Sequence, residues 1–482
     1  MNKFIKSILA LLSIITISFC SSTTTSATTL PSIFNNCVLS LEEGISQLQD
    51  LKSFNKLDFE IRIVREVTDR KECIDMVLGT NLPQGAELEN EKLIDLVVGI
   101  KENEVTESVK ATEYDLYIQQ LEEKSIEKLN LISSPLFGNA EVDQIINNQN
   151  LITYIKSQNP MSYQFMFSEA EGFIYGVDSD LSLTQILDLS DKTIREKEAG
   201  LHTFDFINLE NKDYLIVTYS STDKRYNMSA FEILSDSELG TEINLISFDL
   251  ENDNNVHFGG KILIDKNNLL LCLGDLNSPG NSAKFDSPWG KILNIRTDEI
   301  LNSPISSHED SRIGYVAYGL RNPWSCFIDQ KNLIVPDVGN THWEEINILT
   351  DYNENIDPYF MGWPWFESFF DANYKNTPVD DEIKKQQIDN TFFPSFIYPH
   401  ANDYCAIIGG TNLINFPKWN GYFFIGDFCT GTIWAINIEK NSQLIVLEKN
   451  IIPYSITTIN DSENGTLFVG TTSGSILELT LP

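Results

Sequence analysis

The chain has 482 residues, which is too many for one ordinary compact domain and enough for two or three domains or one large repeat architecture. Its hydrophobic fraction of 42% can fill a core, so the composition argues against a disordered chain. The formal net charge of -35 repels phosphate backbones and argues against nucleic acid as a partner.

The N-terminus is typical of an export signal. Lys3 and Lys6 precede an apolar run, Ser7–Phe19, that is too short to span a bilayer. Cleavage near Ala27 gives a signal peptide over residues 1–27 and a short tether over residues 28–34, whereas cleavage before Cys20 gives a lipoprotein. Both alternatives stay open. In either case we expect an extracytoplasmic protein of the cell envelope, attached to the membrane only if Cys20 carries a lipid.

The cysteines agree with export. Leaving out Cys20, an even number remain: Cys37, Cys73, Cys272, Cys326, Cys405 and Cys429. An even count suits disulfides in an oxidising compartment, although one sequence does not fix their connectivity. Cys37 with Cys73, and Cys405 with Cys429, fall within single predicted modules.

Residues 35–100 predict a small α+β domain. Leu41, Ile45 and Leu48 have helical spacing, and the alternating segment Phe59–Val64 and the apolar segment Leu93–Val98 are typical of strands. With the turn Leu82–Gly85 before the last strand, this order resembles a PASTA module, which implies a cell-wall contact; a generic α+β spacer fits equally well. The acidic, polar residues 101–147 that follow are interpreted as a linker.

From residue 148 to residue 482, short apolar runs alternate with turns rich in Asn, Asp and Gly. Strands of this length, spaced at about 8 to 12 residues, indicate a sandwich, a barrel or a propeller. The region is too long for one sandwich, so we predict an all-β fold with radial repetition, a β-propeller.

Val256–Lys261 and Leu273–Asp275 flank a predicted hairpin and carry the first candidate site residues. His257 stands directly before two glycines, where the backbone turns tightly and exposes the imidazole at a strand end. Asp275 ends the next strand, so both side chains can lie on one rim. This arrangement suits a general base and a carboxylate that fixes its tautomer.

A succession of segments resembles the glucose/sorbosone dehydrogenase family in both order and spacing. The segments are Val256–Lys261, Gly274–Asp275, Ser287–Leu293, Tyr318–Trp324, Asp337–Asn347, Gly362–Pro364 and Gly426–Gly431. The form of Asp337–Asn347, with Cys405 and Cys429, looks closest to the hedgehog-interacting-protein-like branch. The resemblance implies a six-bladed propeller that oxidises sugars with pyrroloquinoline quinone (PQQ) and Ca²⁺.

Carried over by position, the resemblance gives each candidate residue a role. His257 is the base that takes the sugar hydroxyl proton, and Asp275 orients it. Arg321 and Asn322 bind the quinone oxygens, and Arg321 stabilises the negative charge that develops there. Glu198 contacts substrate or cofactor. The carbonyls of Gly339 and Asn340 face Ca²⁺, while Glu345 braces that loop or holds a second ion.

The sequence also departs from the family. PQQ is a tricarboxylate, yet Ile414 and Thr432 stand where basic residues are expected, so binding it requires basic residues elsewhere on the rim. Two hypotheses follow: a PQQ- and Ca²⁺-dependent dehydrogenase of aldose sugars, or a non-catalytic propeller that binds carbohydrate or a protein partner. The remaining histidines show no metal-ligand spacing and are assigned structural or surface roles: His202, His308, His342 and His400.

Overall fold

The computed structural model describes two units of the chain. In the larger unit the described residues are 141–148, 150–265, 268–329, 331–353, 357–372, 377, 379–400, 403–413, 416–437, 443–448, 455–462 and 464–481. In the N-terminal region they are 60–67, 76–82 and 93–100, with the single positions 30, 37, 39, 40, 44, 48, 73 and 88. The expected signal peptide and Ile414 lie outside the described residues, and so does the expected tether apart from Leu30.

The N-terminal unit contains a three-stranded sheet in the order β1-β3-β2. Its strands are β1 (Glu60–Val67), β2 (Val77–Thr80) and β3 (Leu93–Ile100). Gly44 and Leu48 are helical, and Leu48 is buried with Val77 and Leu96 in one apolar cluster. The two expected strands therefore appear as β1 and β3, while the α+β domain as a whole and its likeness to a PASTA module stay predictions.

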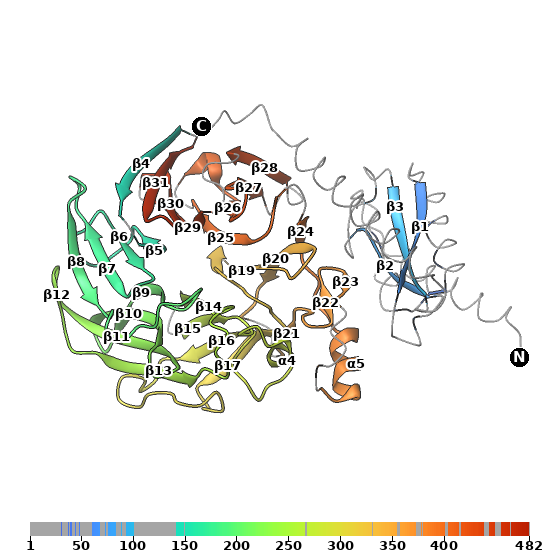
Figure 1. Ribbon diagram of the computed structural model, residues 1–482, viewed down its shortest axis with the longest axis horizontal. Helices are drawn as coiled ribbons and strands as arrows, with labels where there is room; N and C mark the ends of the chain where they lie inside the picture. The colour runs from blue at the N-terminus through green and yellow to red at the C-terminus, as the bar shows by residue number, and fades with distance from the viewer. Residues whose placement is uncertain are drawn as a thin grey trace, which may run out of the picture. The chain divides into compact units, whose positions relative to one another are not determined.

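The larger unit is a six-bladed β-propeller, drawn in Figure 1 as a ring of small sheets around a central axis. The first blade holds β5 (Ile152–Lys156), β6 (Phe165–Glu169), β7 (Phe173–Val177) and β8 (Leu183–Asp188). The second holds β9 (Leu201–Leu209), β10 (Lys212–Ser221), β11 (Arg225–Ser235), β12 (Glu238–Leu239) and β13 (Ile243–Asp249). The third holds β14 (Gly259–Asp265), β15 (Asn268–Leu273), β16 (Lys291–Arg296), β17 (Ile313–Tyr318) and β21 (Tyr359–Phe360).

The second half of the ring follows the same plan. The fourth blade holds β18 (Phe327–Asp329), β19 (Asn332–Asp337), β20 (Trp343–Thr350) and β24 (Phe396–Pro399). The fifth holds β25 (Ile407–Asn412), β26 (Tyr422–Asp427), β27 (Ile433–Asn437) and β28 (Gln443–Glu448). The sixth holds β29 (Ile456–Asp461), β30 (Leu467–Thr471), β31 (Ser475–Thr480) and β4 (Glu141–Asn147).

The ring is closed by a strand that the sequence did not reveal. β4 pairs antiparallel with β31, so the last blade combines the C-terminal strands with residues 141–147. We expected these residues to end the acidic linker, and this boundary was wrong. β4 is an outer edge strand that buries only Ile146, so its sequence shows little of the apolar alternation that marks a strand.

Middle strands of the blades are buried on both faces because neighbouring blades cover them. β26 is buried along its whole length, and β15 is buried from Leu269 to Leu273. Such strands are continuous apolar runs rather than alternating ones. Trp289 and Trp434 are buried between blades, so these tryptophans serve the blade packing.

The remaining described elements decorate the ring. They are α4 (Pro279–Ser282), the hairpin β22 (Phe366–Glu367) with β23 (Phe370–Asp371), α5 (Asp381–Asp389) and the 3₁₀ turn η4 (Pro417–Trp419). In the described part of the chain, no helix has the length and apolar character needed to cross a bilayer. Disulfides join Cys272 to Cys326 and Cys405 to Cys429, and Cys37 and Cys73 are also disulfide-bonded. This chemistry fits an oxidising compartment.

Candidate active site

His257 and Asp275 form a buried hydrogen-bonded pair at one end of the third blade. Nδ1 of His257 lies 2.7 Å from Oδ1 of Asp275. The imidazole reaches this position because His257 has a φ of 59°, which turns the chain just before β14. Gly274 permits the close approach, since a Cβ there would lie 2.2 Å from the carbonyl oxygen of His257.

Asp275 is held in place by further donors. Its Oδ2 accepts a hydrogen bond of 2.9 Å from the indole of Trp363, and its Oδ1 accepts one of 2.7 Å from the N–H of Asn277. A carboxylate fixed in this way keeps the proton of the imidazole on Nδ1. Nε2 of His257 has no hydrogen-bond partner among the described residues, so it is available to accept a proton.

Arg321 lies beside this pair, as the sequence predicts. Its carbonyl oxygen accepts the N–H of Asp275 at 2.8 Å, and its guanidinium carbon is 5.7 Å from the centre of the Trp363 ring. The guanidinium also donates to the carbonyl of Val338 at 3.0 Å and to Oδ1 of Asn340 at 3.4 Å. These contacts use part of its five N–H groups, and the rest stay available to a ligand.

Glu198 and Asn322 complete the group. Oε2 of Glu198 accepts the backbone N–H of His257 at 2.7 Å, and the amide oxygen of Asn322 accepts the N–H of Gly259 at 3.2 Å. Burial raises the pKa of Glu198, while His257, Arg321 and the amide of Asn322 work against that rise. Asn322 therefore uses its amide oxygen in a hydrogen bond within the protein, and it also lines a cavity that adjoins the site.

Asp337 is a residue of this site whose role the sequence did not reveal. Its carboxylate accepts the backbone N–H groups of Arg321 and Asn322, at 2.9 Å and 2.6 Å. Burial raises its pKa to about 7, against the lowering effect of those two N–H groups and of the Arg321 charge. The one sequence signal for this role was its position at the end of β19, within the segment Asp337–Asn347 that resembles the family.

Glu345 and the loop from Gly339 lie behind Asp337. Oε1 of Glu345 accepts the N–H of Ser368, and burial, followed by the charge of Asp337, raises its pKa well above the usual range. Glu345 thus braces the turn between β22 and β23, and its expected role at the Gly339 loop stays a prediction. The carbonyls of Gly339 and Asn340 accept no hydrogen bond from the described residues. They stay free to meet a hard cation, although no group of three or more acidic, His or Cys side chains among the described residues is arranged to hold a metal.

Glu367, which the sequence did not single out, organises the same loop. Its Oε1 accepts the N–H groups of four successive residues, Asn340, Thr341, His342 and Trp343. Burial alone would raise its pKa, but these donors hold it below the usual value. The carboxylate of Glu367 therefore accepts all four of these backbone N–H groups.

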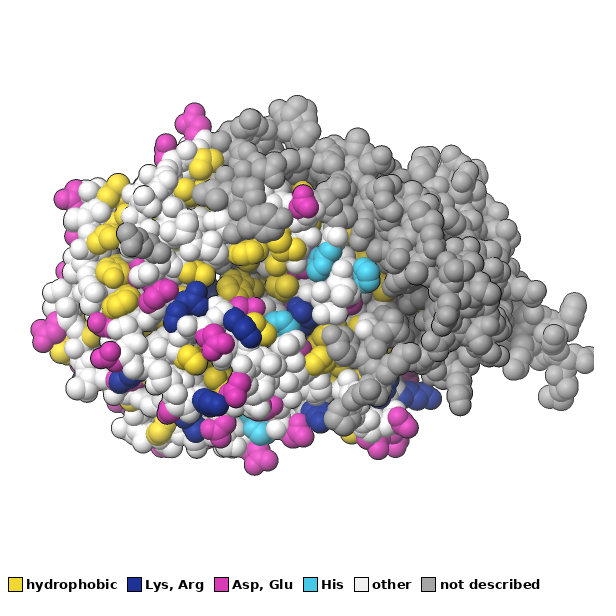
Figure 2. Space-filling model, in the orientation of Figure 1, with side chains coloured by type: hydrophobic (Ala, Val, Ile, Leu, Met, Phe, Trp, Pro, Cys, Tyr) yellow, Lys and Arg dark blue, Asp and Glu magenta, His cyan; other side chains and the backbone are white. Residues whose placement is uncertain are grey.

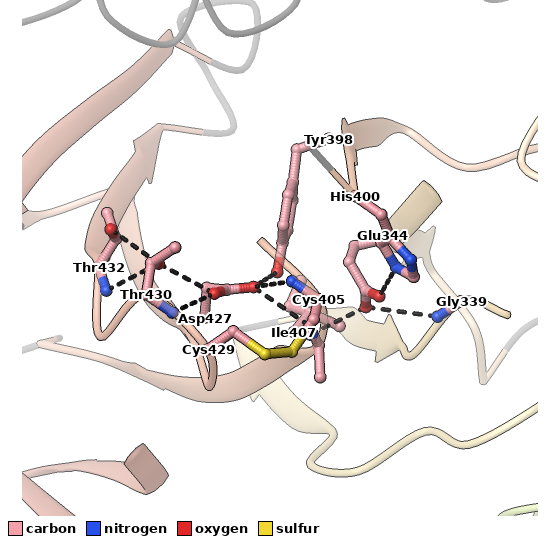
Figure 3. Close-up of a disulfide and its surroundings, with 11 residues drawn as sticks. Gly339, Glu344, Tyr398, His400, Cys405, Ile407, Asp427, Cys429, Thr430 and Thr432 are labelled. Atoms are coloured by element: carbon pink, nitrogen blue, oxygen red, sulfur yellow. Dashed lines mark hydrogen bonds and ion pairs between the residues drawn. A yellow bond between two sulfur atoms is a disulfide. The ribbon is translucent and has the colours of Figure 1, made fainter. Parts of the chain in front are cut away.

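Thr432 stands where a basic residue that binds PQQ was expected, and it is not among the residues that line the cavity beside the site. Figure 3 shows Thr432 bonded to Thr430, which in turn donates to Asp427 beside the Cys405–Cys429 disulfide. Oδ2 of Asp427 also accepts the hydroxyl of Tyr398 at 3.0 Å. Thr432 is thus tied into a hydrogen-bond network that joins the fourth and fifth blades, at the position where a basic side chain was expected.

Basic residues stand on another wall instead. A cavity of about 420 Å³ adjoins the site, and Glu198, Gly259, Asn322 and Val338 form part of its lining. Arg195 and Lys197, from the loop between β8 and β9, line it too, and Glu198 is the one acidic residue in the described lining. Figure 2 shows Lys and Arg side chains beside a histidine at the centre of this face.

The molecule is thus a six-bladed propeller in which a buried His–Asp pair and a guanidinium lie beside one of its cavities. The sequence profile of the glucose/sorbosone dehydrogenase family matches residues 159–478, and the chain belongs to this family. The HIPL2 protein of Arabidopsis thaliana is 25% identical over 231 residues, which are 41% of this chain and 32% of that protein. The chain thus aligns with about a third of that relative.

Solved structures agree on the fold. The PQQ-bound aldose sugar dehydrogenase of Streptomyces coelicolor is 15% identical and superposes with a TM-score of 0.53, covering 71% of this chain and 99% of that one. The apo soluble aldose sugar dehydrogenase of Escherichia coli is 17% identical, with a TM-score of 0.54 over the same shares. At this identity the likeness establishes the propeller and leaves the chemistry to the residues.

Proposed function

We propose that the protein oxidises aldose sugars, with His257 as general base and PQQ and Ca²⁺ as cofactors. The observation that carries the proposal is the His257–Asp275 pair at 2.7 Å, which leaves Nε2 as an acceptor, while the backbone of Arg321 is bonded to that of Asp275. When bound, PQQ supplies the hydride acceptor. Family membership supports sugar oxidation in general, and the residues of this chain support the finer assignment.

The residues around the cavity fit an anionic quinone. Arg195 and Lys197 offer positive charge at its wall, which meets the need left by the missing cations near Ile414 and Thr432. Arg321, with part of its N–H groups uncommitted, would bind the quinone oxygens. The carbonyls of Gly339 and Asn340 would contribute hard oxygen ligands to Ca²⁺.

The chain's own residues then act on the sugar in a defined way. Nε2 of His257 takes the proton of the sugar hydroxyl, and Asp275 stabilises the imidazolium that forms. Arg321 would stabilise the negative charge that develops on the quinone oxygens as they receive the electrons of the hydride. Glu198 holds the backbone of His257 and, as a residue of the cavity wall, would contact the substrate or the cofactor.

A quinone titration tests the cofactor assignment. We expect PQQ to bind the Ca²⁺-loaded protein, and Lys197→Gln to weaken binding about tenfold, the effect of losing ~1.4 kcal/mol from one charge-assisted contact. The readout is quenching of tryptophan fluorescence. Lys224→Gln is the matched control, since Lys224 is an exposed lysine paired with Asp253. An absence of quinone binding would favour the non-catalytic propeller that binds carbohydrate or a protein partner.

Sugar-dependent dye reduction tests the base. His257→Ala should lower the rate of aldose oxidation by about 10²–10⁴, the usual contribution of a positioned general base. His308→Ala, in a surface turn, should leave the rate unchanged. A His257→Ala protein that still binds PQQ and turns over at the wild-type rate would exclude His257 as the base.

A further inference from the structure

A second, larger cavity opens on the central axis of the propeller. It measures about 970 Å³, and its lining includes Lys156, Asp205, Asn412 and Asp461. These residues come from β5, β9, β25 and β29, which are first strands of their blades. Tyr154 and Lys261 line both this cavity and the one beside the candidate active site, so the two cavities meet at these side chains.

Lys261 is an unusual lysine. Its exposed fraction is only 6%, and its Nζ lies 3.2 Å from the centre of the Tyr154 ring. No described residue accepts a hydrogen bond from this amine. A buried ammonium without hydrogen-bond acceptors is costly, because burial removes its water and only the face of the Tyr154 ring replaces it.

Lys291 provides the contrast within the same blade. It is fully buried, and its Nζ donates to the carbonyls of Asn281 and Trp289 at 2.7 Å and 2.8 Å. Burial lowers its pKa to about 7. Lys291 therefore combines a low pKa with complete hydrogen bonding, and it lines neither of these two cavities.

The charges around Lys261 favour its neutral form. Burial lowers the pKa of Lys261 well below the usual value, and the charge of Lys156 lowers it further, against Asp205 and Asp461. Lys156 forms an ion pair with Asp205 at 2.9 Å, so this carboxylate is already neutralised. Asp461 accepts the hydroxyl of Thr411 at 3.3 Å, and burial raises its pKa. Desolvation and a neighbouring cation are the two usual ways of making a lysine nucleophilic.

We propose that Lys261 is a reactive amine that forms imines with small aldehydes and ketones entering through the larger cavity. The lone pair of Nζ adds to the carbonyl carbon, a carbon–nitrogen double bond replaces the carbon–oxygen bond, and the oxygen leaves as water with both amine protons. The step is reversible and needs no oxidant or reductant. It goes beyond sugar oxidation, because it uses neither His257 nor a quinone.

Reductive trapping tests the proposal. The full-length protein is incubated with acetaldehyde and sodium cyanoborohydride at pH 7, and ethylated lysines are mapped by peptide mass spectrometry. We expect Lys261 to be ethylated at least about tenfold faster than exposed Lys224, because each unit by which a lysine pKa falls raises its neutral fraction tenfold. Lys261→Arg, which replaces the amine by a guanidinium that forms no imine, should lose this fast modification and no other.

Lys291 and His257 supply the matched controls. Lys291 should stay unmodified, since its pKa is low but neither of the two cavities reaches it. His257→Ala should leave the trapping unchanged, so a failure of the sugar-oxidation proposal is separable from a failure of this one. Ethylation of Lys261 no faster than that of Lys224, or equal ethylation of Lys291, would overturn the proposal.

The neighbouring lysine gives a further readout. Lys156→Met removes a positive charge near Lys261 and also releases Asp205, and both changes raise the pKa of Lys261. The rate of trapping at pH 7 should therefore fall and recover at higher pH. The groups that shape this profile are Tyr154 and Lys156 on β5, Asp205 on β9 and Asp461 on β29. A pH profile identical to that of the wild type would contradict the assigned electrostatics.

Discussion

At the scale of single residues, the candidate site depends on how its carboxylates are used. Asp275 is fully buried and accepts hydrogen bonds from an imidazole, an indole and a backbone N–H. Asp337 accepts two backbone N–H groups and so fixes the turn that carries Arg321 and Asn322. One carboxylate thus orients the base, and the other orients the guanidinium.

Asp275→Asn is the sharpest test of the orienting carboxylate. An amide in that place offers one acceptor oxygen instead of two, so either the imidazole or the indole of Trp363 loses its partner. We expect aldose oxidation to slow by about 10²–10⁴ with quinone affinity unchanged, because only the placement of the base proton is altered. Trp363→Phe removes one donor and should have a smaller effect. A rate within about threefold of wild type for Asp275→Asn would exclude the orienting role.

The pair formed by Glu344 and His400 predicts a stability effect outside the catalytic group. Glu344 is fully buried, and it accepts from Nε2 of His400 and from the N–H of Ile407 at 2.8 Å (Figure 3). His400→Phe leaves this carboxylate without its charged partner, and we expect unfolding to become easier by about 3–5 kcal/mol in urea titrations. The double variant with Glu344→Gln should recover part of the loss, because no buried charge is left unpaired.

The pH dependence of this effect has a definite sign. Burial alone would lower the pKa of His400, but the hydrogen bond and charge of Glu344 raise it above its usual value. A histidine with a raised pKa stabilises the fold fully below its unfolded pKa of about 6.5, and the stabilisation disappears as pH rises through the folded pKa. The difference between wild type and His400→Phe should therefore shrink above about pH 7. A difference that grows with pH would contradict the pairing.

At the scale of elements, ring closure by β4 is the feature with the clearest consequence. Within this strand Ile146 is buried, at 7% exposed, whereas Val142 is 39% exposed. Ile146→Ala should cost about 2–5 kcal/mol of unfolding free energy, because it opens a cavity between β31 and the first blade. Val142→Ala is the matched control and should change stability by less than about 0.5 kcal/mol. Equal effects of the two substitutions in chemical denaturation would exclude β4 as the closing strand.

Some strands were predicted correctly and one was missed, and each outcome has a physical reason. The expected hairpin after His257 appears as β14 and β15, with Ile262 opposite Leu271, because apolar strands joined by a turn of Asn and Lys have few alternatives. The segment Ser475–Thr480 is β31 without change. β4 was missed because an outer strand needs little apolar surface, so its sequence resembles a linker.

At the scale of the molecule, the net charge of -35 should influence stability. Like charges spread over one chain repel each other and oppose the compact state, and salt screens this repulsion. We expect the melting temperature to rise by several degrees between about 0.01 M and 0.5 M NaCl, as the Debye length falls from about 30 Å to below 10 Å. Choline chloride at equal ionic strength should give the same rise. A melting temperature that falls with salt would show that ion pairs outweigh the repulsion.

Local and repetitive features could be predicted from the sequence alone. Short apolar runs predicted the blades, and the order of segments from Val256 to Gly431 placed His257, Asp275 and Arg321 in one family and one site. These features survive in a single sequence because strands and tight turns depend on neighbouring residues.

Which distant side chains meet could not be predicted from the sequence and became visible in the folded chain. Trp363 reaches Asp275 across 88 positions, and β4 reaches β31 across the whole propeller. Likewise, Lys261 lies against Tyr154 and near the charge of Lys156 in the larger cavity. Arg195 and Lys197 line the smaller cavity, although the basic residues expected from the family are missing. Closure of the ring brings these groups together, because contacts between blades depend on the radial arrangement and not on spacing along the chain.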